Sequence, residues 1–134
     1  MRYELGSQNY ADEIKRASEA NGIPDGILYR LIKTESDFNP YAENSESGAY
    51  GISQFMPDTA KEKGVDPHDP HASIAAAAVY LRELYDHFGS WDQAIEAYNW
   101  GPGNVDRWIA KGEDPEAMPL ETKNYVARVN PSQS

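Results

Sequence analysis

The chain has 134 residues, of which 40% are hydrophobic and none is cysteine, and its formal net charge is −10. This length and composition predict one globular domain with a single hydrophobic core. The lack of cysteine excludes disulfides and thiolate chemistry, and the acidic charge argues against nucleic acid or an anionic membrane surface as the main partner.

The first part of the chain has the spacing of two helices. Residues 9–21 predict an N-terminal helix that Gly22 ends, and Pro24 suits the first turn of the next helix. In that helix Glu35 continues an apolar stripe, so its carboxylate is expected to face inward. The helix should end just before Pro40, because proline disfavours helical geometry in the preceding residue. The apolar stripe consists of Ile27, Leu28, Leu31 and Ile32.

The middle of the chain alternates loops and helices. Residues 41–51 form a polar loop containing glycine, and a short hairpin is permitted over residues 45–53. A short helix is expected over residues 57–64. Asp69 is the expected N-cap of the longest helix, which runs from Pro70 to about residue 87. The inner stripe of this helix is predicted to contain Ile74, Ala77, Ala78, Leu81, Leu84, Tyr85 and Phe88.

The last third predicts three more helices. Ser90 and Gln93 have the spacing of a capping box at the start of the first, and the other two are expected over residues 104–111 and 120–129. We therefore predict an all-α domain, allowing one short hairpin. Its expected organisation is an N-terminal helix in residues 1–22, a core in residues 23–129 and a flexible tail in residues 130–134.

Carboxylate, amide and aromatic side chains gather at the ends of the predicted elements. A partly buried carboxylate next to a loop suits general acid–base chemistry, and Glu35 has that position. Amides can read sugar hydroxyl and N-acetyl groups, and aromatic rings can pack on pyranose faces. Taken singly, each of these residues is more simply read as a helix cap or a core aromatic. Together they favour a sugar polymer as the substrate.

Four motifs occur in order: Glu35-Ser36-x-Phe38-x-Pro40; Ser45 with Gly48-Ala49-x-Gly51-Ile52-x-Gln54-x-Met56-Pro57-x-Thr59-Ala60; Ala97-Tyr98-Asn99-x-Gly101-Pro102-Gly103-x-Val105; and Glu121-Thr122-x-x-Tyr125-Val126. Together they resemble the catalytic domain of the soluble lytic transglycosylase (SLT) family, which is related to goose-type lysozyme. The resemblance covers about residues 23–129. It implies a compact lysozyme-like fold, and peptidoglycan cleaved between N-acetylmuramic acid and N-acetylglucosamine.

The resemblance also implies roles for individual residues. Glu35 matches the catalytic acid/base, and Glu121 matches a buried glutamate that braces the cleft. Trp100 stands where the family usually has a small residue, so it is expected to narrow the cleft or to add a stacking surface. The implied substrate contacts are Ser45, Gln54, Met56, Tyr98, Asn99 and Tyr125. The alignment at Ser45 needs one extra residue, so Ser47 is an alternative. We expect no cofactor and no metal.

A single carboxylate predicts a particular mechanism. Ordinary glycosidases use two carboxyl groups, whereas here Glu35 is expected to act first as acid and then as base. The substrate's N-acetyl group, oriented by Tyr98, would stabilise the developing cation, and its C6 hydroxyl would close a 1,6-anhydro ring. An intramolecular nucleophile reaches an effective molarity on the order of 10⁵ M or more. Partial burial by Phe38 and Met56 is expected to raise the pKa of Glu35 and keep it protonated.

Three other readings remain open from the sequence. Lysozyme-type hydrolysis of the same bond would need a second acid, for which Asp37 or Glu121 is available. A non-catalytic glycan-binding module could retain the fold. A metal site at His68 and His71 is the third, although Pro70 between them favours a turn.

The sequence also bears on where the protein acts. We see no signal peptide and no membrane span, and the acidity argues against unaided wall binding. We therefore expect a monomeric domain that acts in the bacterial cell wall or periplasm and is delivered by a larger protein or assembly, such as a phage virion or tail. A fragment of a larger protein is the alternative.

Overall fold

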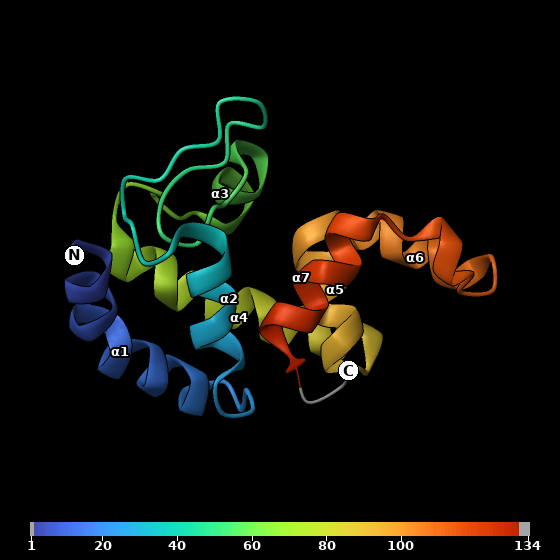
Figure 1. Cartoon of the computed structure of the whole chain (residues 1–134), viewed down its shortest axis with the longest axis horizontal. Coiled ribbons are helices and arrows are strands. Elements are labelled where there is room, and N and C mark those ends of the chain that lie inside the picture. The colour runs from blue at the N-terminus through green and yellow to red at the C-terminus, as the bar shows by residue number, and fades with distance from the viewer. Residues whose placement is uncertain (1, 132–134) are drawn as a thin grey trace. The chain divides into compact units, whose positions relative to one another are not determined.

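The computed structural model describes residues 2–131, with side chains from Tyr10 onward, and the expected all-α class is confirmed over this range (Figure 1). By their internal contacts, Met1–Val79 and Tyr80–Ser134 form two compact units, called here the N-terminal and C-terminal units. The helices are α1 Arg2–Ala20, α2 Ile27–Ser36, α3 Pro57–Lys63, α4 Pro70–Phe88, α5 Trp91–Trp100, α6 Pro102–Ala110 and α7 Leu120–Val129, with a 3-10 turn, η1, at Pro115–Ala117.

In the N-terminal unit α1 packs against α2, and the apolar stripe predicted for α2 is buried (Figure 1). The prediction that Pro24 lies in the first turn of this helix is wrong, because α2 begins at Ile27. Its N-cap is Gly26, which adopts a left-handed conformation with φ 85°. Such backbone interrupts a right-handed helix, so Pro24 belongs to the connection that precedes α2.

The segment between α2 and α3 folds back on itself without a regular strand among the described residues. In place of the permitted hairpin there are two isolated bridges, Glu43 with Tyr50 and Tyr50 with Phe55. The amide of Gly51 donates to the carbonyl of Ala42 at 2.8 Å, which closes the loop. Backbone groups of the loop thus satisfy one another instead of pairing in a ladder.

Gly51 is required at its position for two physical reasons. Its φ is +87°, and a Cβ there would overlap the main-chain oxygen of Pro67. We expect Gly51→Ala to lower the free energy of unfolding by about 2 kcal/mol, because left-handed strain and a clash with backbone add together. Gly64→Ala is the matched control: it has φ +67° but nothing within 4 Å, so it should cost about 1 kcal/mol. Urea unfolding measures both, and equal losses would contradict the clash.

Helices α3 and α4 begin and end close to where the sequence predicts. Gly64 caps α3 in a left-handed conformation, and the Asp69 carboxylate accepts from the amides of His71 at 3.0 Å and Ala72 at 3.2 Å. Asp69 is therefore the N-cap of α4, as predicted. Most of the predicted inner stripe is buried, and its last two members, Tyr85 and Phe88, are half-buried.

In the C-terminal unit α5 packs against both α6 and α7 (Figure 1). The amide of Gln93 donates to Ser90 Oγ at 3.2 Å, which confirms Ser90 as the N-cap of α5. The second half of the capping box differs, because the Gln93 side chain donates to Glu113 Oε1 at 3.2 Å. Helix α6 starts at Pro102, two residues earlier than predicted. Proline needs no amide partner at a helix start and has a suitable φ, so it favours this position.

The first residue of the predicted tail packs against the protein. Asn130, assigned from the sequence to the flexible tail, is buried, and its Nδ2 donates to Asp92 Oδ1 at 2.9 Å. This bond ties the end of α7 to the first turn of α5 through Asn130, the first residue after α7. Of the rest of the predicted tail, Pro131 is exposed, and residues 132–134 lie outside the described residues.

Over the described part of the chain, none of the helices combines the length and the apolar character that crossing a membrane requires.

Candidate functional site

The last turn of α2 holds Glu35 partly buried and is fixed to the following loop. Ser36 Oγ lies 2.6 Å from the carbonyl oxygen of Ile52, to which it donates a hydrogen bond. A second acceptor, the carbonyl oxygen of Ile32 one turn earlier in α2, lies at 3.3 Å. The bond to Ile52 spans sixteen residues of sequence. The carboxylate of Glu35 therefore stands on a rigid helix end, next to a loop that the same end holds in place.

Two residues in left-handed backbone stop α2 directly after this turn. Asp37 has φ 52°, and its amide donates to the carbonyl of Lys33 at 2.8 Å; Phe38 has φ 64°. Phe38 is only 2% exposed, and its ring lies 4.9 Å from that of Tyr29. Burial of this aromatic ring offsets the backbone strain that the turn requires. Asp37 is exposed.

Gln54 donates its side-chain amide hydrogens to backbone carbonyls of its own loop. Its backbone is left-handed at φ 55°, and its Nε2 donates to the carbonyls of Ala42 at 3.0 Å and Gly51 at 2.9 Å. A carboxamide has two N–H donors, so the carbonyl oxygen is the part of this side chain suited to accept from a ligand. Gln54 therefore holds the loop in shape.

The other predicted contacts in the N-terminal unit are more exposed. Met56 precedes α3 and is 44% exposed, and Ser45 lies at the exposed tip of the loop. Ser47, the alternative to Ser45, accepts from the amide of Ala49 at 3.2 Å and so belongs to the turn. Both serine side chains are exposed, and the Ser47 hydroxyl retains its own hydrogen for donation.

In the C-terminal unit Asn99 is oriented by α7. Its Oδ1 accepts from Thr122 Oγ1 at 2.9 Å, and its Nδ2 lies 3.5 Å from Glu121 Oε2. Thr122 is almost fully buried, which makes this bond a firm anchor. The motif at the end of α5 and the motif at the start of α7 are therefore one hydrogen-bonded cluster. Thr122 lies in the fourth sequence motif, but the motif alone predicts no role for it.

Three further predicted residues in this unit differ in burial. Tyr98 is half-buried, and its ring lies 5.6 Å from the Tyr80 ring at 48°. Tyr125 is buried. Glu121, by contrast, is exposed, so the expectation of a buried glutamate at this position is wrong. It occupies the first turn of α7, where a negative charge is favourable next to the helix N-terminus without any need for burial.

The buried glutamate of this unit is Glu96, which sequence reasoning missed. It is 9% exposed, and its Oε1 has no hydrogen-bond partner. Burial, followed by the nearby negative charges of Asp92 and Glu113, raises the pKa of Glu96 from 4.5 to about 7. The apolar neighbours Ile95 and Ala97 do not reveal this burial in the sequence, because successive positions on a helix do not share a face.

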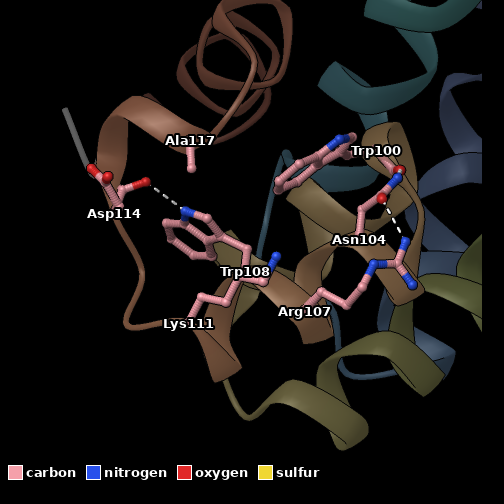
Figure 2. A pocket seen from close by; sticks show the side chains of 7 residues that line it. All are labelled: Trp100, Asn104, Arg107, Trp108, Lys111, Asp114 and Ala117. Atoms are coloured by element: carbon pink, nitrogen blue, oxygen red, sulfur yellow. Dashed lines mark hydrogen bonds between the residues drawn. The ribbon is translucent and has the colours of Figure 1, made fainter.

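A pocket of about 210 Å³ lies between α6 and the segment that follows it (Figure 2). Trp108 Nε1 donates to the main-chain oxygen of Asp114 at 2.7 Å. On another wall Arg107 Nη2 donates to Asn104 Oδ1, and Asn104 Nδ2 to the Trp100 carbonyl, each at 2.7 Å. The lining residues are Trp100, Asn104, Arg107, Trp108, Lys111, Asp114 and Ala117.

The two histidines considered as metal ligands have separate partners. His68 Nδ1 lies 3.2 Å from Asp66 Oδ1, and His71 Nδ1 lies 2.8 Å from Glu13 Oε1. Within the described side chains, no group of three or more His, Cys, Asp or Glu residues is arranged to hold a metal ion. Each histidine has the geometry of an ion pair or hydrogen bond at the surface, within its own turn for His68 and with a distant residue of α1 for His71.

Comparison with known proteins connects both units to one family. The family model "Transglycosylase SLT domain" matches residues 12–120. A transglycosylase of Enterobacteria phage PRD1 is 34% identical over 125 residues, covering 92% of this chain and 43% of its own length. The membrane-bound lytic murein transglycosylase C of Edwardsiella ictaluri is 34% identical, covering 75% of this chain and 33% of its own.

Solved structures agree with the sequence comparison. The 70 kDa soluble lytic transglycosylase SLT70 of Escherichia coli superimposes with a TM-score of 0.78 at 30% identity, over 90% of this chain and 22% of its own. Slt of Pseudomonas aeruginosa, an inactive glutamate-to-glutamine mutant, gives 0.75 at 28% identity, over 87% and 22%. This chain thus spans less than half the length of each of these relatives. It has the lysozyme-like fold of their SLT region. It belongs to the transglycosylase SLT domain family.

Proposed function

We propose that this chain is a peptidoglycan lytic transglycosylase that cleaves the bond between N-acetylmuramic acid and N-acetylglucosamine and leaves 1,6-anhydro-muramic acid ends. The observation that carries the proposal is the SLT match over residues 12–120, which contains Glu35 on its braced helix end. The inactive Pseudomonas aeruginosa Slt supports it, since a glutamate-to-glutamine change accompanies loss of activity in that relative.

Glu35 is the proposed catalytic residue. Protonated at the start, it donates to the glycosidic oxygen as the bond to the muramic acid C1 breaks. As a carboxylate it then takes the proton of the C6 hydroxyl, whose oxygen forms the new bond to C1. The proton count of Glu35 is restored, and no water is consumed. An intramolecular hydroxyl supplies an effective molarity on the order of 10⁵ M, so no second carboxylate has to activate a nucleophile.

The remaining residues are proposed to bind the glycan. Tyr98 and Asn99 take the muramic acid N-acetyl group, and the bonds of Asn99 to α7 fix its amide for that contact. Glu121 and Trp100 support the Tyr98–Asn99 motif from its flanks. The other proposed glycan contacts are Ser45, Gln54, Met56 and Tyr125.

We propose that a larger protein or assembly delivers this domain to the cell wall. The chain's net charge of −10 does not favour unaided capture by an anionic wall. Relatives include a transglycosylase of phage PRD1 and the peptidoglycan transglycosylase gp16 of phage T7, of which this chain covers 10% of the length. Such relatives are compatible with virion delivery.

Product analysis separates transglycosylation from hydrolysis in the same fold. Purified peptidoglycan is digested with the chain, and the released muropeptides are weighed by mass spectrometry. We expect 1,6-anhydro ends, which are lighter by one water than reducing ends. Released material with reducing ends only would establish hydrolysis, and would direct attention to Asp37 or Glu121 as the second acid. Binding of a soluble glycan without any release would indicate a non-catalytic module.

A further inference from the structure

The pocket of Figure 2 combines aromatic and cationic side chains, and among them only Trp100 also has a part in the proposed site, beside Tyr98 and Asn99. Trp100 and Trp108 border it from α5 and α6. Arg107 and Lys111 bring two positive charges, against the one negative charge of Asp114. The whole chain has 22 acidic against 12 basic residues, so this pocket is positively charged in a negatively charged protein. This contrast points to an anionic group in the ligand.

The cations are available for such a group. Among the described side chains, no carboxylate forms an ion pair with Arg107 or Lys111. Arg107 is instead held by its bond to Asn104, which orients the guanidinium before any ligand arrives. An arginine fixed in this way matches a carboxylate well, because two parallel N–H groups can meet its two oxygens.

The opposite wall of the pocket is fixed as well. The Glu113 amide donates to the Trp108 carbonyl at 3.0 Å, and the indole of Trp108 donates to the Asp114 carbonyl. The Asp114 carboxylate caps η1 by accepting from the Glu116 amide at 3.0 Å. The indole therefore has its N–H satisfied within the protein, and its ring bounds a preformed space. A flat apolar ring is suited to the C–H face of a pyranose.

The size of the pocket limits the ligand. Drug-sized molecules occupy pockets of roughly 300–1,000 Å³, whereas this pocket has about 210 Å³. It suits one sugar residue with its substituent, not an oligosaccharide. The requirements of an apolar face, hydroxyl or amide groups and a carboxylate are all met by muramic acid, whose lactyl substituent ends in a carboxyl group. In peptide-bearing strands the nearby carboxylates belong to the attached peptide.

We propose that this pocket is a second glycan-binding site, which takes a muramic acid residue by stacking on tryptophan and by pairing its carboxylate with Arg107 and Lys111. The inference rests on the proposed function for the identity of the polymer. A site of this kind would hold a neighbouring part of the strand, or another strand, while the reaction proceeds at Glu35.

Nuclear magnetic resonance of the ¹⁵N-labelled chain tests the proposal, with Glu35→Gln as background so that no ligand is cut. The chain has three tryptophans, so Trp108→Phe identifies the indole N–H signal of Trp108. Three ligands are compared: a peptide-free tetrasaccharide of alternating N-acetylglucosamine and N-acetylmuramic acid, a peptide-bearing disaccharide, and neutral chitotetraose. We expect a saturable shift of the Trp108 signal with the carboxylate-bearing ligands and a weaker response to chitotetraose.

Removing the cations should weaken that response selectively. We expect Arg107→Gln with Lys111→Gln to raise the Kd read at Trp108 about tenfold for the carboxylate ligands, and to leave chitotetraose unchanged. The matched control, Lys123→Gln with Arg128→Gln, removes two exposed positive charges from α7 of the same unit and should change neither. The peptide-free and peptide-bearing ligands show which carboxylate is taken.

Three outcomes would overturn the proposal: a Trp108 signal that stays still while others shift, equal affinities for charged and neutral sugars, or equal losses in the two double variants. An unchanged spectrum of the free Arg107/Lys111 variant shows that its fold is kept. Binding is read without turnover, so a failure to find anhydro products would reject the proposed reaction while leaving this measurement intact.

Discussion

Glu35→Gln is expected to lower the rate of peptidoglycan cleavage by at least about 10³-fold while leaving the midpoint of thermal unfolding nearly unchanged. A positioned general acid contributes roughly 10²–10⁴-fold, and here the same group is proposed to serve as acid and then as base. Glutamine keeps the shape of the side chain but neither donates nor accepts a proton at that position as a carboxyl group does. Turbidity loss of purified cell walls measures the rate, and circular dichroism the fold.

The neighbouring carboxylate provides the matched control for this experiment. Asp37 is exposed and lies in left-handed backbone, which asparagine also tolerates. Asp37→Asn should therefore fold normally and retain cleavage within about threefold, since a surface substitution of this kind is close to neutral. A large loss in Asp37→Asn would favour a two-carboxylate hydrolase. Wild-type cleavage by Glu35→Gln would remove Glu35 from the reaction.

Local features of the sequence predicted much of the fold because they act over a few residues. The stripe from Ile27 to Ile32 is buried, and Asp69 and Ser90 cap their helices. In each case helical periodicity or a short side-chain bond decides the outcome within one or two turns. The all-α class follows from the same signals. Pro24 was misplaced because Gly26, two residues later, interrupts the helix by its own conformation.

Features that depend on distant partners were not predicted. Sequence spacing alone does not show that Ser36 donates to Ile52, or that Asn99 is held by Thr122 of another helix. The pocket at Trp108 depends on the return of residues 111–117 toward α6, for which a loop composition gives no direction. Whether a single charged side chain is buried also depends on distant parts of the chain. Glu121 was expected to be buried and Glu96 was overlooked, because burial depends on which helix face is covered.

Glu96 gives the stability of the protein a pH dependence of its own. The carboxyl group is buried on α5, has an oxygen without a partner, and lies near the negative charges of Asp92 and Glu113. Its pKa rises from 4.5 to about 7 for these reasons, burial first. In the unfolded chain the group ionises near 4.5, whereas in the folded chain it keeps its proton until about pH 7. The folded state therefore binds one more proton between these values.

We expect the contribution of Glu96 to the free energy of unfolding to fall as pH rises from 4.5 to 7. Above pH 7 this contribution should stay at its lower level. A raised pKa in the folded state gives stability that is complete below the unfolded value and is lost by the folded value. With about 1.36 kcal/mol per pKa unit, the shift corresponds to about 3 kcal/mol. Glu96→Gln carries no ionisable proton and should lack this part of the pH dependence.

Urea unfolding at pH 4.5, 6 and 7.5 measures the difference between wild type and Glu96→Gln. The decisive quantity is the change of that difference with pH, because a buried amide has its own hydrogen-bonding cost at every pH. We expect Glu96→Gln to gain about 3 kcal/mol relative to wild type across this range. Glu116→Gln removes an exposed carboxylate of the same unit and should run parallel to wild type. If the free energy of unfolding of Glu96→Gln instead changed with pH just as that of wild type does, Glu96 would be ionised in the folded protein at acidic pH and in contact with water.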